Sequence, residues 1–485
     1  MINLNKIKIR KLQIVLKIFF LVFINIKSLY AAFFKDISNL IENNIPRLSY
    51  GVAVSDIDHD DKFDFIVTGY RYPNLALSYK KNKLVNIIND KVFVDSSRQA
   101  IGVVACDIDL DGTEEIYFLN TDSFSGDKKF SDRLLDFNDN GVVDIFENNI
   151  NKKVLNFTAG RSVACIDRMG NGKYSIYVSN YGGPSRFYSM QDYKLIDEAP
   201  KLKLDRVTGG RAVVAGHILS EKMDIFAANE RGANFLYKNI NNKFFNVAKK
   251  YGVEDEYQNG RGTVLSDILY RGRLDIISGN WQGFHRIYIL RKNKFLDLVD
   301  SSFNLPSKVR TIISADFDND GFDEIFLNNI GQANRLFKIK ENGILEKISL
   351  SYAKLNKGLG TGAAVADIDG DGILEFLISN GESLKQPLNL FKANINKHSS
   401  YLRVRPLNKY NAPARGATVI LKSNLRTHAK TIDAGSGYLC QMEPVAHFGI
   451  RKNEKDFQIT IKWTNGVTQS IEILELNKEI KVQQK

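Results

Sequence analysis

Cysteine is scarce in this chain. The 485 residues contain three cysteines, Cys106, Cys165 and Cys440. Three cysteines exclude the dense disulfide framework of a small secreted domain and allow one bridge at most. Cys106 and Cys165 lie one and two residues before their respective polar loops, so strand alternation places them on opposite strand faces. We therefore expect all three cysteines to be small buried hydrophobic residues.

The short motifs that carry catalysis are also missing. The sequence has no Gly-x-Ser-x-Gly elbow, no phosphate-binding loop and no His/Cys spacing typical of zinc. His447 stands alone in an expected strand, and we expect it to pack in a core or behind a site. No Lys/Arg block marks a nucleic-acid site. These absences argue against an enzyme, and they leave no catalytic residue to name.

Long apolar runs are confined to the beginning of the chain. A basic start at residues 6–11 precedes an apolar stretch at residues 12–26, and small residues follow. This pattern predicts a secretory signal peptide over residues 1–31, with a retained membrane anchor as the alternative. No other stretch is long and apolar enough to span a bilayer. We therefore expect a secreted or periplasmic protein, with association with the cell surface as an alternative.

The charge of the chain is basic, but half of that charge belongs to the leader. The formal net charge is +12, and residues 1–31 contain six Lys or Arg and no acid. The mature surface is therefore mildly basic, which permits weak attraction to acidic polymers.

What the chain has in abundance is repetition. About every fifty residues, an apolar strand runs into a short polar loop and out into a second strand, and a third and a fourth strand follow. The seven loops start at Asp56, Asp107, Asp167, His217, Asp267, Asp316 and Asp367. Seven repeats of four strands without long helical periodicity predict an all-β fold, a seven-bladed β-propeller over residues 32–398. A solenoid is the alternative.

The seventh repeat favours closure of the ring. It shows three clear strands before residue 400, and residues 33–37 look like the missing fourth strand. We expect this N-terminal segment to complete blade 7, which removes the free sheet edges. After residue 400 the period stops, and alternating strands between Gly/Asn turns predict a small β-sandwich over residues 399–485.

Four of the seven loops carry a full set of calcium ligands. Oxygen ligands at loop positions 1, 3 and 5, a turn at 6, a carbonyl at 7 and a carboxylate at 9 suit a hard cation. A nearly all-protein cage favours Ca²⁺ over strongly hydrated Mg²⁺. The first loop is the weakest, because Asp61 replaces glycine at position 6. The ligands expected for about four Ca²⁺ sites are Asp56, Asp58, Asp60, Lys62, Asp64, Asp107, Asp109, Asp111, Thr113, Glu115, Asp316, Asp318, Asp320, Phe322, Glu324, Asp367, Asp369, Asp371, Ile373 and Glu375.

The other three loops have lost the ligand set. The third, which starts at Asp167, offers too little charge, and the fourth, residues 217–224, is one residue short. In the fifth loop Arg271 lies between Asp267 and Asp275. We expect its guanidinium to replace the ion as a built-in counter-charge.

An eighth acidic cluster, at residues 136–144, is interpreted as a decoy. It lacks the apolar entry strand and falls where other repeats have the hairpin between strands three and four. Its Asn140-Gly141 pair favours a hairpin turn. We therefore expect no fifth metal site there.

Arginines recur at the other end of the innermost strands. Each lies six residues before a loop start, so blades 3 to 6 would place them as an arc around one mouth of the channel. The candidate ligand-binding residues on this face are Arg161, Arg211, Arg261, Arg310, Tyr181 and Trp281. Two interpretations stay open. The arc binds carboxylate, sulfate or phosphate groups, or each arginine bonds to carbonyls or acids of a neighbouring blade.

Longer stretches sharpen these expectations. The acidic loops resemble the FG-GAP/VCBS calcium repeats of integrin-α-like propellers, and residues 159–168, 309–320 and 435–449 resemble the cartilage acidic protein 1 family. The last stretch falls in what looks like its ASPIC/UnbV domain. The resemblance implies a secreted calcium-binding propeller that works by protein contacts. Animal relatives add a cysteine-rich EGF-like module and are acidic, so their partners are not carried over to this basic chain.

The function that these patterns favour is a secreted, calcium-binding module for adhesion, a monomer whose partner is an extracellular protein or an acidic glycan. The alternative is an extracellular polysaccharide hydrolase or lyase that uses the arginine-lined channel mouth. Carboxylates or a Tyr/His pair around that mouth would favour the enzyme, and a plugged channel would favour the module.

Overall fold

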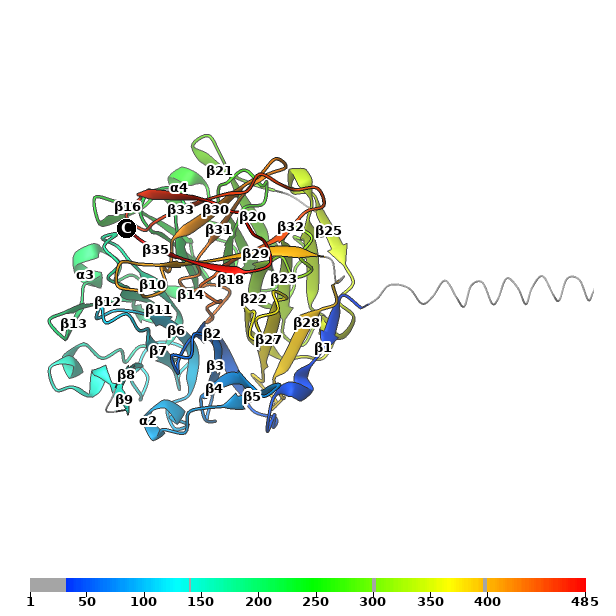
Figure 1. Ribbon diagram of the computed structural model, residues 1–485. Helices are drawn as coiled ribbons and strands as arrows, with labels where there is room; N and C mark the ends of the chain where they lie inside the picture. The colour runs from blue at the N-terminus through cyan, green and yellow to red at the C-terminus, as the bar shows by residue number, and fades with distance from the viewer. Residues whose placement is uncertain (1–31, 139–140, 299–301, 396–398) are drawn as a thin grey trace, which may run out of the picture.

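The structure is a computed structural model that describes residues 32–138, 141–298, 302–395 and 399–485 (Figure 1). The signal peptide expected at residues 1–31 lies outside the described residues. Within them, no helix has the length and apolar character needed to cross a membrane. The helices are single turns in connections: α2 (Lys91–Val94), α3 (Ala199–Leu202) and α4 (Ala248–Tyr251), with the 3₁₀ turns η1 (Ser38–Leu40), η2 (Ile145–Glu147), η3 (Asn151–Val154), η4 (Glu341–Gly343) and η5 (Ser351–Lys354).

The propeller consists of four-stranded antiparallel blades, as the repeats predict, and pairing of residues 181–184 with residues 207–209 joins blades 3 and 4 into one eight-stranded sheet. The first three are blade 1, β2 (Ser49–Ser55), β3 (Asp64–Gly69), β4 (Leu75–Lys80) and β5 (Lys83–Asn86); blade 2, β6 (Ala100–Cys106), β7 (Glu115–Asn120), β8 (Arg133–Asn138) and β9 (Gly141–Asp144); and blade 3, β10 (Gly160–Ile166), β11 (Ser175–Pro184), β12 (Arg186–Gln191) and β13 (Lys194–Asp197). The next three are blade 4, β14 (Val207–Gly216), β15 (Asp224–Asn229), β16 (Phe235–Ile240) and β17 (Lys243–Asn246); blade 5, β18 (Gly260–Ser266), β19 (Asp275–Asn280), β20 (Arg286–Arg291) and β21 (Lys294–Asp297); and blade 6, β22 (Val309–Ala315), β23 (Glu324–Asn329), β24 (Arg335–Ile339) and β25 (Leu345–Ile348).

Blade 7 combines the two ends of the propeller segment. It contains β26 (Gly360–Ala366), β27 (Glu375–Asn380), β28 (Asn389–Ala393) and the N-terminal strand β1 (Phe34–Asp36). β1 pairs antiparallel with β28, so the expected closure by the N-terminal segment is confirmed. The innermost strand of each blade contacts that of the next, and β26 contacts β2, which completes the ring. The Phe34 ring anchors β1 by packing against Phe317 and Phe376.

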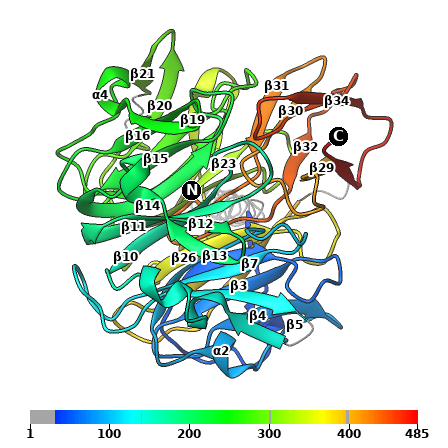
Figure 2. The same ribbon diagram turned by 90° about the vertical axis from the view of Figure 1, so that its left-hand side faces the viewer.

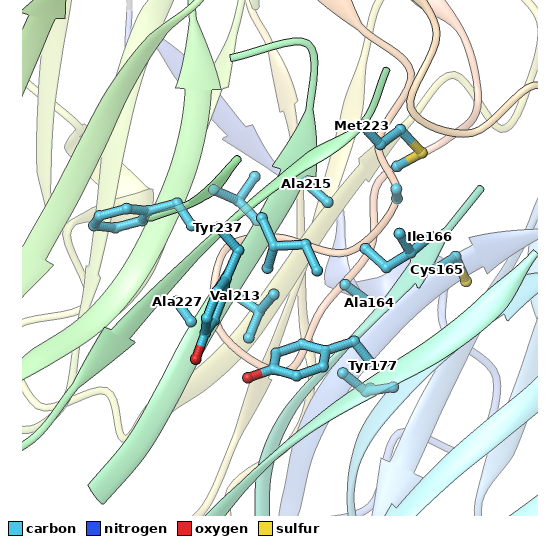
Figure 3. Close-up of a cluster of buried hydrophobic side chains, with 14 of the residues drawn as sticks. Ala164, Cys165, Ile166, Tyr177, Val213, Ala215, Met223, Ala227 and Tyr237 are labelled. Carbon is cyan, nitrogen blue, oxygen red and sulfur yellow. The ribbon is translucent and has the colours of Figure 1, made fainter. Parts of the chain in front are cut away.

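The core lies between blades, where both faces of each sheet are covered. Every residue of β6, β10, β18 and β26 is buried. Figure 3 shows one such layer, in which Ala164 and Tyr177 of blade 3 lie beside Val213, Ala227 and Tyr237 of blade 4. Sheets that are apolar on both faces explain why the inner strands read as continuous apolar runs.

The cysteines depart from the expectation. Cys106 of β6 and Cys165 of β10 form a disulfide with their Cα atoms 6.2 Å apart, so their assignment as free hydrophobic residues was wrong. They do lie on opposite strand faces, but adjacent blades pack one face against the opposite face of the next. That stacking brings the two sulfurs together. Cys440 is a buried thiol as expected, and burial raises the pKa of Cys440 to about 11.

The C-terminal domain is a two-sheet sandwich, which confirms the expected fold class. One sheet has the order β32-β29-β35 with β29 and β35 parallel, and the other has the order β31-β30-β33-β34. The strands are β29 (Ser400–Leu407), β30 (Thr418–Lys422), β31 (Thr427–Thr431), β32 (Ala446–Ile450), β33 (Gln458–Lys462), β34 (Thr468–Glu472) and β35 (Glu479–Gln483). Trp463 and Phe448 are buried between the sheets. Figure 2 shows this domain in orange and red against the propeller.

Candidate functional site

The C-terminal domain sits on the face that carries the polar loops. The first residue of a loop serves as an acceptor for it in several blades. Asp167 Oδ2 accepts a hydrogen bond from Thr464 Oγ1 at 2.6 Å, and Asp316 Oδ2 accepts one from the Gly449 amide at 2.9 Å. The loops therefore hold the second domain as well as any ion.

One fully buried arginine fastens the two domains. Arg415 bonds to Glu114 in the blade 2 loop, with Nε 2.7 Å from Oε1. The same guanidinium donates to the carbonyls of Val54, Asp433 and Met442. A charge this deeply buried is stable only because every arm of its fork has an acceptor.

In each of the four acidic loops the structure brings three of the predicted carboxylates together, but Asp60, Glu324 and Glu375 belong to none of these groups. Each loop holds three carboxylate oxygens within 4.8 Å of one another: Asp56, Asp58 and Asp64; Asp107, Asp109 and Glu115; Asp316, Asp318 and Asp320; and Asp367, Asp369 and Asp371. The carboxylate at the ninth position makes the same hydrogen bond in all four loops. One of its oxygens accepts a hydrogen bond from the backbone amide of the second loop residue. The pairs are Ile57 to Asp64 (3.1 Å), Ile108 to Glu115 (2.7 Å), Phe317 to Glu324 (3.0 Å) and Ile368 to Glu375 (3.0 Å). This bond aims the second oxygen into the loop.

In all four loops that second oxygen has no hydrogen-bond partner, and in blades 1 and 2 no lysine or arginine of the described residues forms an ion pair with it either. Asp64 Oδ1 and Glu115 Oε1 are buried and accept no hydrogen bond. Burial raises the pKa of Asp64 to about 7 and raises the pKa of Glu115 well above its ordinary value. A buried carboxylate without a counter-charge is costly. The donor set of these two loops therefore fits a hard cation such as Ca²⁺.

Blade 2 receives one further acid from its third strand. Asp136 of β8 lies with Asp111 and Glu115 in a second group of three carboxylates, and its buried Oδ1 accepts no hydrogen bond. The expected hairpin between the third and fourth strands is confirmed, because β8 and β9 pair, and Asp144 bonds to Arg133 at 2.7 Å. Among the described residues the cluster forms no metal group of its own, but Asp136 adds to the group of blade 2.

In blade 6 a lysine lies among the carboxylates. Lys338 of β24 places its Nζ 2.6 Å from Asp318 Oδ2, 2.7 Å from Asp320 Oδ2 and 3.0 Å from Glu324 Oε1. The lysine side chain is 6% exposed. Its ammonium stands where a cation bound by these three oxygens would stand.

Blade 7 repeats this arrangement. Lys392 of β28 places its Nζ 2.7 Å from Asp369 Oδ2 and 2.9 Å from Asp371 Oδ2, and it also contacts Glu375 Oε1. In blade 1 the nearest counterpart, Lys80, reaches Asp58 and is 43% exposed. The loops of blades 6 and 7 thus share a buried lysine that contacts the ninth carboxylate, whereas the lysine of blade 1 reaches Asp58 instead.

In blade 5 an arginine neutralises the loop carboxylates, as expected. Arg271 Nη2 lies 2.6 Å from Asp275 Oδ1, and the Arg271 amide donates to Asp267. The guanidinium is the counter-charge that the sequence predicts.

The channel of the propeller is filled by residues 433–443 of the C-terminal domain, which we call the plug. Gly437 exchanges two backbone hydrogen bonds with Thr263 of blade 5, at 2.7 and 2.8 Å. The Gln441 side chain bonds to the amide and the carbonyl of Ala105 in blade 2. Other bonds join Ala434 to Cys165, Gln441 to Val52, Cys440 to Ala363 and Glu443 to Val365. A loop that bonds to the innermost strands of five blades occupies the channel.

The tip of the plug reaches the arginine arc. Tyr438 and the four arginines, Arg161, Arg211, Arg261 and Arg310, line one cavity of about 240 Å³ at the far mouth of the channel. Burial alone would raise the pKa of Tyr438, but the four guanidiniums, Arg211 first, lower it below its ordinary value. The sequence alone gave no reason to place this tyrosine there.

Each arginine also has partners within the protein. Arg211 and Arg261 share Glu230, Arg310 pairs with Glu382, and Arg161 donates to the carbonyls of Ser123 and Phe124. Acids and carbonyls of neighbouring blades are the partners that the structural interpretation expects. Tyr181 stacks on Arg211 at 4.5 Å from guanidinium carbon to ring centre, and Trp281 stacks on Arg310 at 4.7 Å. Both aromatic rings are half-buried.

His447 is buried in the interface between the domains. It is 4% exposed, and its Nε2 lies 2.6 Å from Asn319 Oδ1 in the blade 6 loop. Burial lowers the pKa of His447 well below its ordinary value. The expected packing role is confirmed, and the partner is the loop of another domain.

An acidic-loop propeller whose channel is closed by a C-terminal sandwich defines the class of this protein. The FG-GAP-like repeat family matches residues 316–378, and the ASPIC and UnbV family matches residues 407–485. The chain belongs to the cartilage acidic protein 1 family. It is 42% identical over 482 residues to cartilage acidic protein 1 of Mus musculus, which covers 91% of this chain and 74% of the relative. The Homo sapiens protein is equally similar, over 91% of this chain and 73% of the relative. Among solved structures, YCF48 from Cyanidioschyzon merolae is similar with a TM-score of 0.44 and 10% identity, over 75% of this chain and 98% of that chain.

Proposed function

We propose that this protein is an extracellular, calcium-stabilised binding module that performs no catalysis. The observation that carries the proposal is the pair of buried carboxylate oxygens, on Glu115 and Asp136, that accept no hydrogen bond and aim into one loop. Oxygens of this kind need a cation, and carboxylates at these spacings suit Ca²⁺.

Calcium would act here as a structural ion. The ligands come from the loop between the first two strands and, in blade 2, also from the third strand, Asp136. A bound ion would neutralise acids that lie under the C-terminal domain, near the ion pair of Arg415 with Glu114. It would therefore stabilise the blade and the domain interface together.

The four expected sites are not equivalent in this proposal. Loops 1 and 2 hold carboxylates that lack a partner, so they bind calcium most readily. In loops 6 and 7 calcium competes with the ammonium groups of Lys338 and Lys392. Because ammonium and Ca²⁺ need the same oxygens, the lysine lowers the affinity or takes the place of the ion.

A monomer in a secreted or periplasmic setting, also at a cell surface, fits these features. Family membership and the Cys106–Cys165 disulfide favour an oxidising compartment. The partner class that we propose is an extracellular protein or an acidic glycan. The filled channel favours a binding module, because a propeller enzyme would use the open channel mouth.

One observation favours the alternative, an extracellular polysaccharide hydrolase or lyase. Tyr438 lies among four arginines, and their charge lowers its pKa. A tyrosine that lies among arginines is suited to proton abstraction next to a sugar carboxylate. Incubation with polyuronates and chromatography of the products separates the two functions, since a binding module leaves the chain length unchanged.

The proposed function is tested by thermal melting with and without calcium. Extracellular calcium sites bind at roughly 10⁻⁴–10⁻³ M, so each occupied loop should add about 0.4–1.4 kcal/mol at millimolar Ca²⁺. We expect EDTA to lower the melting temperature by several degrees and Ca²⁺, but not equimolar Mg²⁺, to restore it. An identical melting curve in all three conditions would exclude calcium as a structural ion.

A further inference from the structure

The arginine cavity lies on the face opposite the calcium loops. Its arginines stand at the beginning of the innermost strands, and the acidic loops follow the end of those strands. The C-terminal domain covers the loop face and reaches the cavity through Tyr438 and Leu439 of the plug. Any ligand of this cavity therefore uses a surface that the calcium sites do not supply.

The charges around the cavity do not balance. Four guanidiniums meet three carboxylates: Glu230, shared by Arg211 and Arg261; Glu382, paired with Arg310; and Asp122, which lines the wall and accepts the Lys129 amide. One positive charge is left over. A monoanion would neutralise it, whereas a dianion would reverse it.

The excess charge is concentrated at Arg161. This residue is 7% exposed and donates to the carbonyls of Gly160, Ser123 and Phe124. No carboxylate of the described residues lies within 4.0 Å of its guanidinium nitrogens. Its Nε is buried and has no hydrogen-bond partner, and the same holds for Nε of Arg261 and Arg310. Burying unpaired charged donors is costly. An oxyanion in the cavity would supply the acceptors.

Aromatic rings form the other walls. Tyr50 and Tyr70 pack together with ring centres 5.6 Å apart, and both line the cavity. Phe124 also lines it, although 65% of its surface is exposed. Flat apolar faces beside charged donors suit a sugar ring that carries an acid group. The volume of about 240 Å³ lies below the range typical of drug-sized ligands, about 300–1,000 Å³, so it fits one monosaccharide unit.

We propose that this cavity binds one monoanionic sugar residue of an acidic glycan, with the carboxylate or sulfate ester held by Arg161, Arg211 and the Tyr438 hydroxyl. The proposal deepens the proposed function and rests on its glycan-binding form. Arg161 contributes the unneutralised charge, and Arg211 lies close enough to Tyr438, 3.5 Å from Nη1 to Oη, for both to contact one oxygen. Because Tyr438 comes from the plug, the second domain completes the binding site of the first.

The test is titration calorimetry of the full chain with small probes. Glucuronate and glucose 6-sulfate present the two possible acid groups on the same ring, glucose lacks the charge, acetate lacks the ring, and glucose 6-phosphate carries a second charge. We expect glucuronate or glucose 6-sulfate to bind about tenfold or more tightly than any of the other three. The better of the two identifies the acid group. Trp281, which stacks on Arg261 and Arg310, gives a local fluorescence readout.

Two variants locate the binding. Arg161→Gln removes the excess charge, and Tyr438→Phe removes one hydroxyl while keeping the ring in the channel. Each should weaken glucuronate or sulfate-sugar binding about tenfold, and Arg161→Lys should restore part of it. Arg286→Gln is the control, because Arg286 pairs with Asp255 and Asp297 outside the cavity. The melting temperature of Tyr438→Phe should stay near that of the unaltered chain, since its contact with Arg211 is long.

Several results would overturn the proposal. If glucose binds as tightly as the acidic sugars, the acid group does not contribute to recognition. If acetate binds as tightly as the acidic sugars, the aromatic rings contribute nothing. Unchanged affinity in both Arg161→Gln and Tyr438→Phe, or binding of an acidic peptide without binding of either acidic sugar, also excludes this site. These results are separable from the calcium proposal, because melting with Ca²⁺ and EDTA is measured on the same samples.

Discussion

Blades 1 and 2 and blades 6 and 7 carry the same loop motif but differ in whether a lysine contacts the ninth carboxylate. In all four loops the ninth carboxylate keeps a buried oxygen without a hydrogen-bond partner, but in the second pair a lysine of the third strand forms an ion pair with that oxygen. The loop residues barely differ between the pairs. The loops of blades 2 and 6 differ in the residue that the adjacent third strand places beside the ninth loop position, which is Asp136 in blade 2 and Lys338 in blade 6.

We expect the largest loss of stability when the closed ring of blades, which includes both pairs of loops, is opened. Deletion of residues 32–38 removes β1 and leaves β28, the strand that carries Lys392, as an open edge. We expect aggregation or rapid proteolysis, because an exposed apolar edge invites pairing with other chains. Light scattering and limited trypsin digestion measure this.

A matched pair of point variants shows whether packing or mere length matters in β1. Phe34→Ala empties a buried position and should cost about 3–5 kcal/mol of unfolding free energy. Lys35→Ala, at an exposed position of the same strand, should cost little. Equal stability of the deletion product and the full chain would contradict the ring closure.

The second effect separates the two pairs directly. Lys338→Met strips blade 6 of its counter-charge and leaves three carboxylates facing one another. Without calcium we expect a loss of about 3–5 kcal/mol of unfolding free energy, as for a broken buried ion pair. Millimolar Ca²⁺ should restore most of it, because the ion then takes the vacated position. Chemical denaturation with and without Ca²⁺ gives both values, and Lys80→Met, at a 43% exposed lysine, is the control.

The third effect compares the same substitution in the two pairs. Asp109→Ala in blade 2 should remove one site's share of the calcium stabilisation, about 0.4–1.4 kcal/mol at millimolar Ca²⁺. Asp318→Ala in blade 6 should change this calcium-dependent share much less, since Lys338 already neutralises that loop. The quantity to compare is the melting shift on addition of Ca²⁺. Equal losses of that shift would mean that the lysine does not compete.

We expect the smallest effect from a change at Asp136, the acid that the third strand adds to the blade 2 group. Asp136→Asn keeps the shape of the side chain and removes one charge from the blade 2 group. We expect the calcium affinity of that single site to fall several-fold while the metal-free stability stays the same or rises, because a buried unpaired charge is lost. Lys62→Ala should leave the affinity unchanged, since only its backbone carbonyl is an expected ligand.

The sequence was sufficient for features that recur at a fixed spacing. The loops, the closing strand and the arginine arc all follow from the fifty-residue period, and Arg271 was found because it lies inside its loop. The sequence did not predict that Lys338 and Lys392 contact the loops. They lie 14 and 17 residues after Glu324 and Glu375, because the connections between the second and third strands differ in length. Only the register of the sheet reveals that they face the loop.

Contacts between different repeats were the second kind of feature that the sequence did not predict. The Cys106–Cys165 bridge depends on how adjacent blades stack, which strand alternation within one blade does not describe. The plug has no periodicity at all, so nothing in residues 433–443 indicated that they enter the channel or that Tyr438 meets the arginines. A Gly-Ser-Gly-Tyr run between two strands was the one available signal, and it is typical of any tight loop.

The most direct test of the account is calcium stoichiometry, measured by titration calorimetry on metal-stripped protein. The unaltered chain should show two tighter sites, from blades 1 and 2, and weaker or no binding at the other two loops. The double variant Lys338→Met, Lys392→Met should show four sites of similar affinity. Four equivalent sites in the unaltered chain, or no gain in the double variant, would contradict the claim that the third strand decides which loops hold calcium.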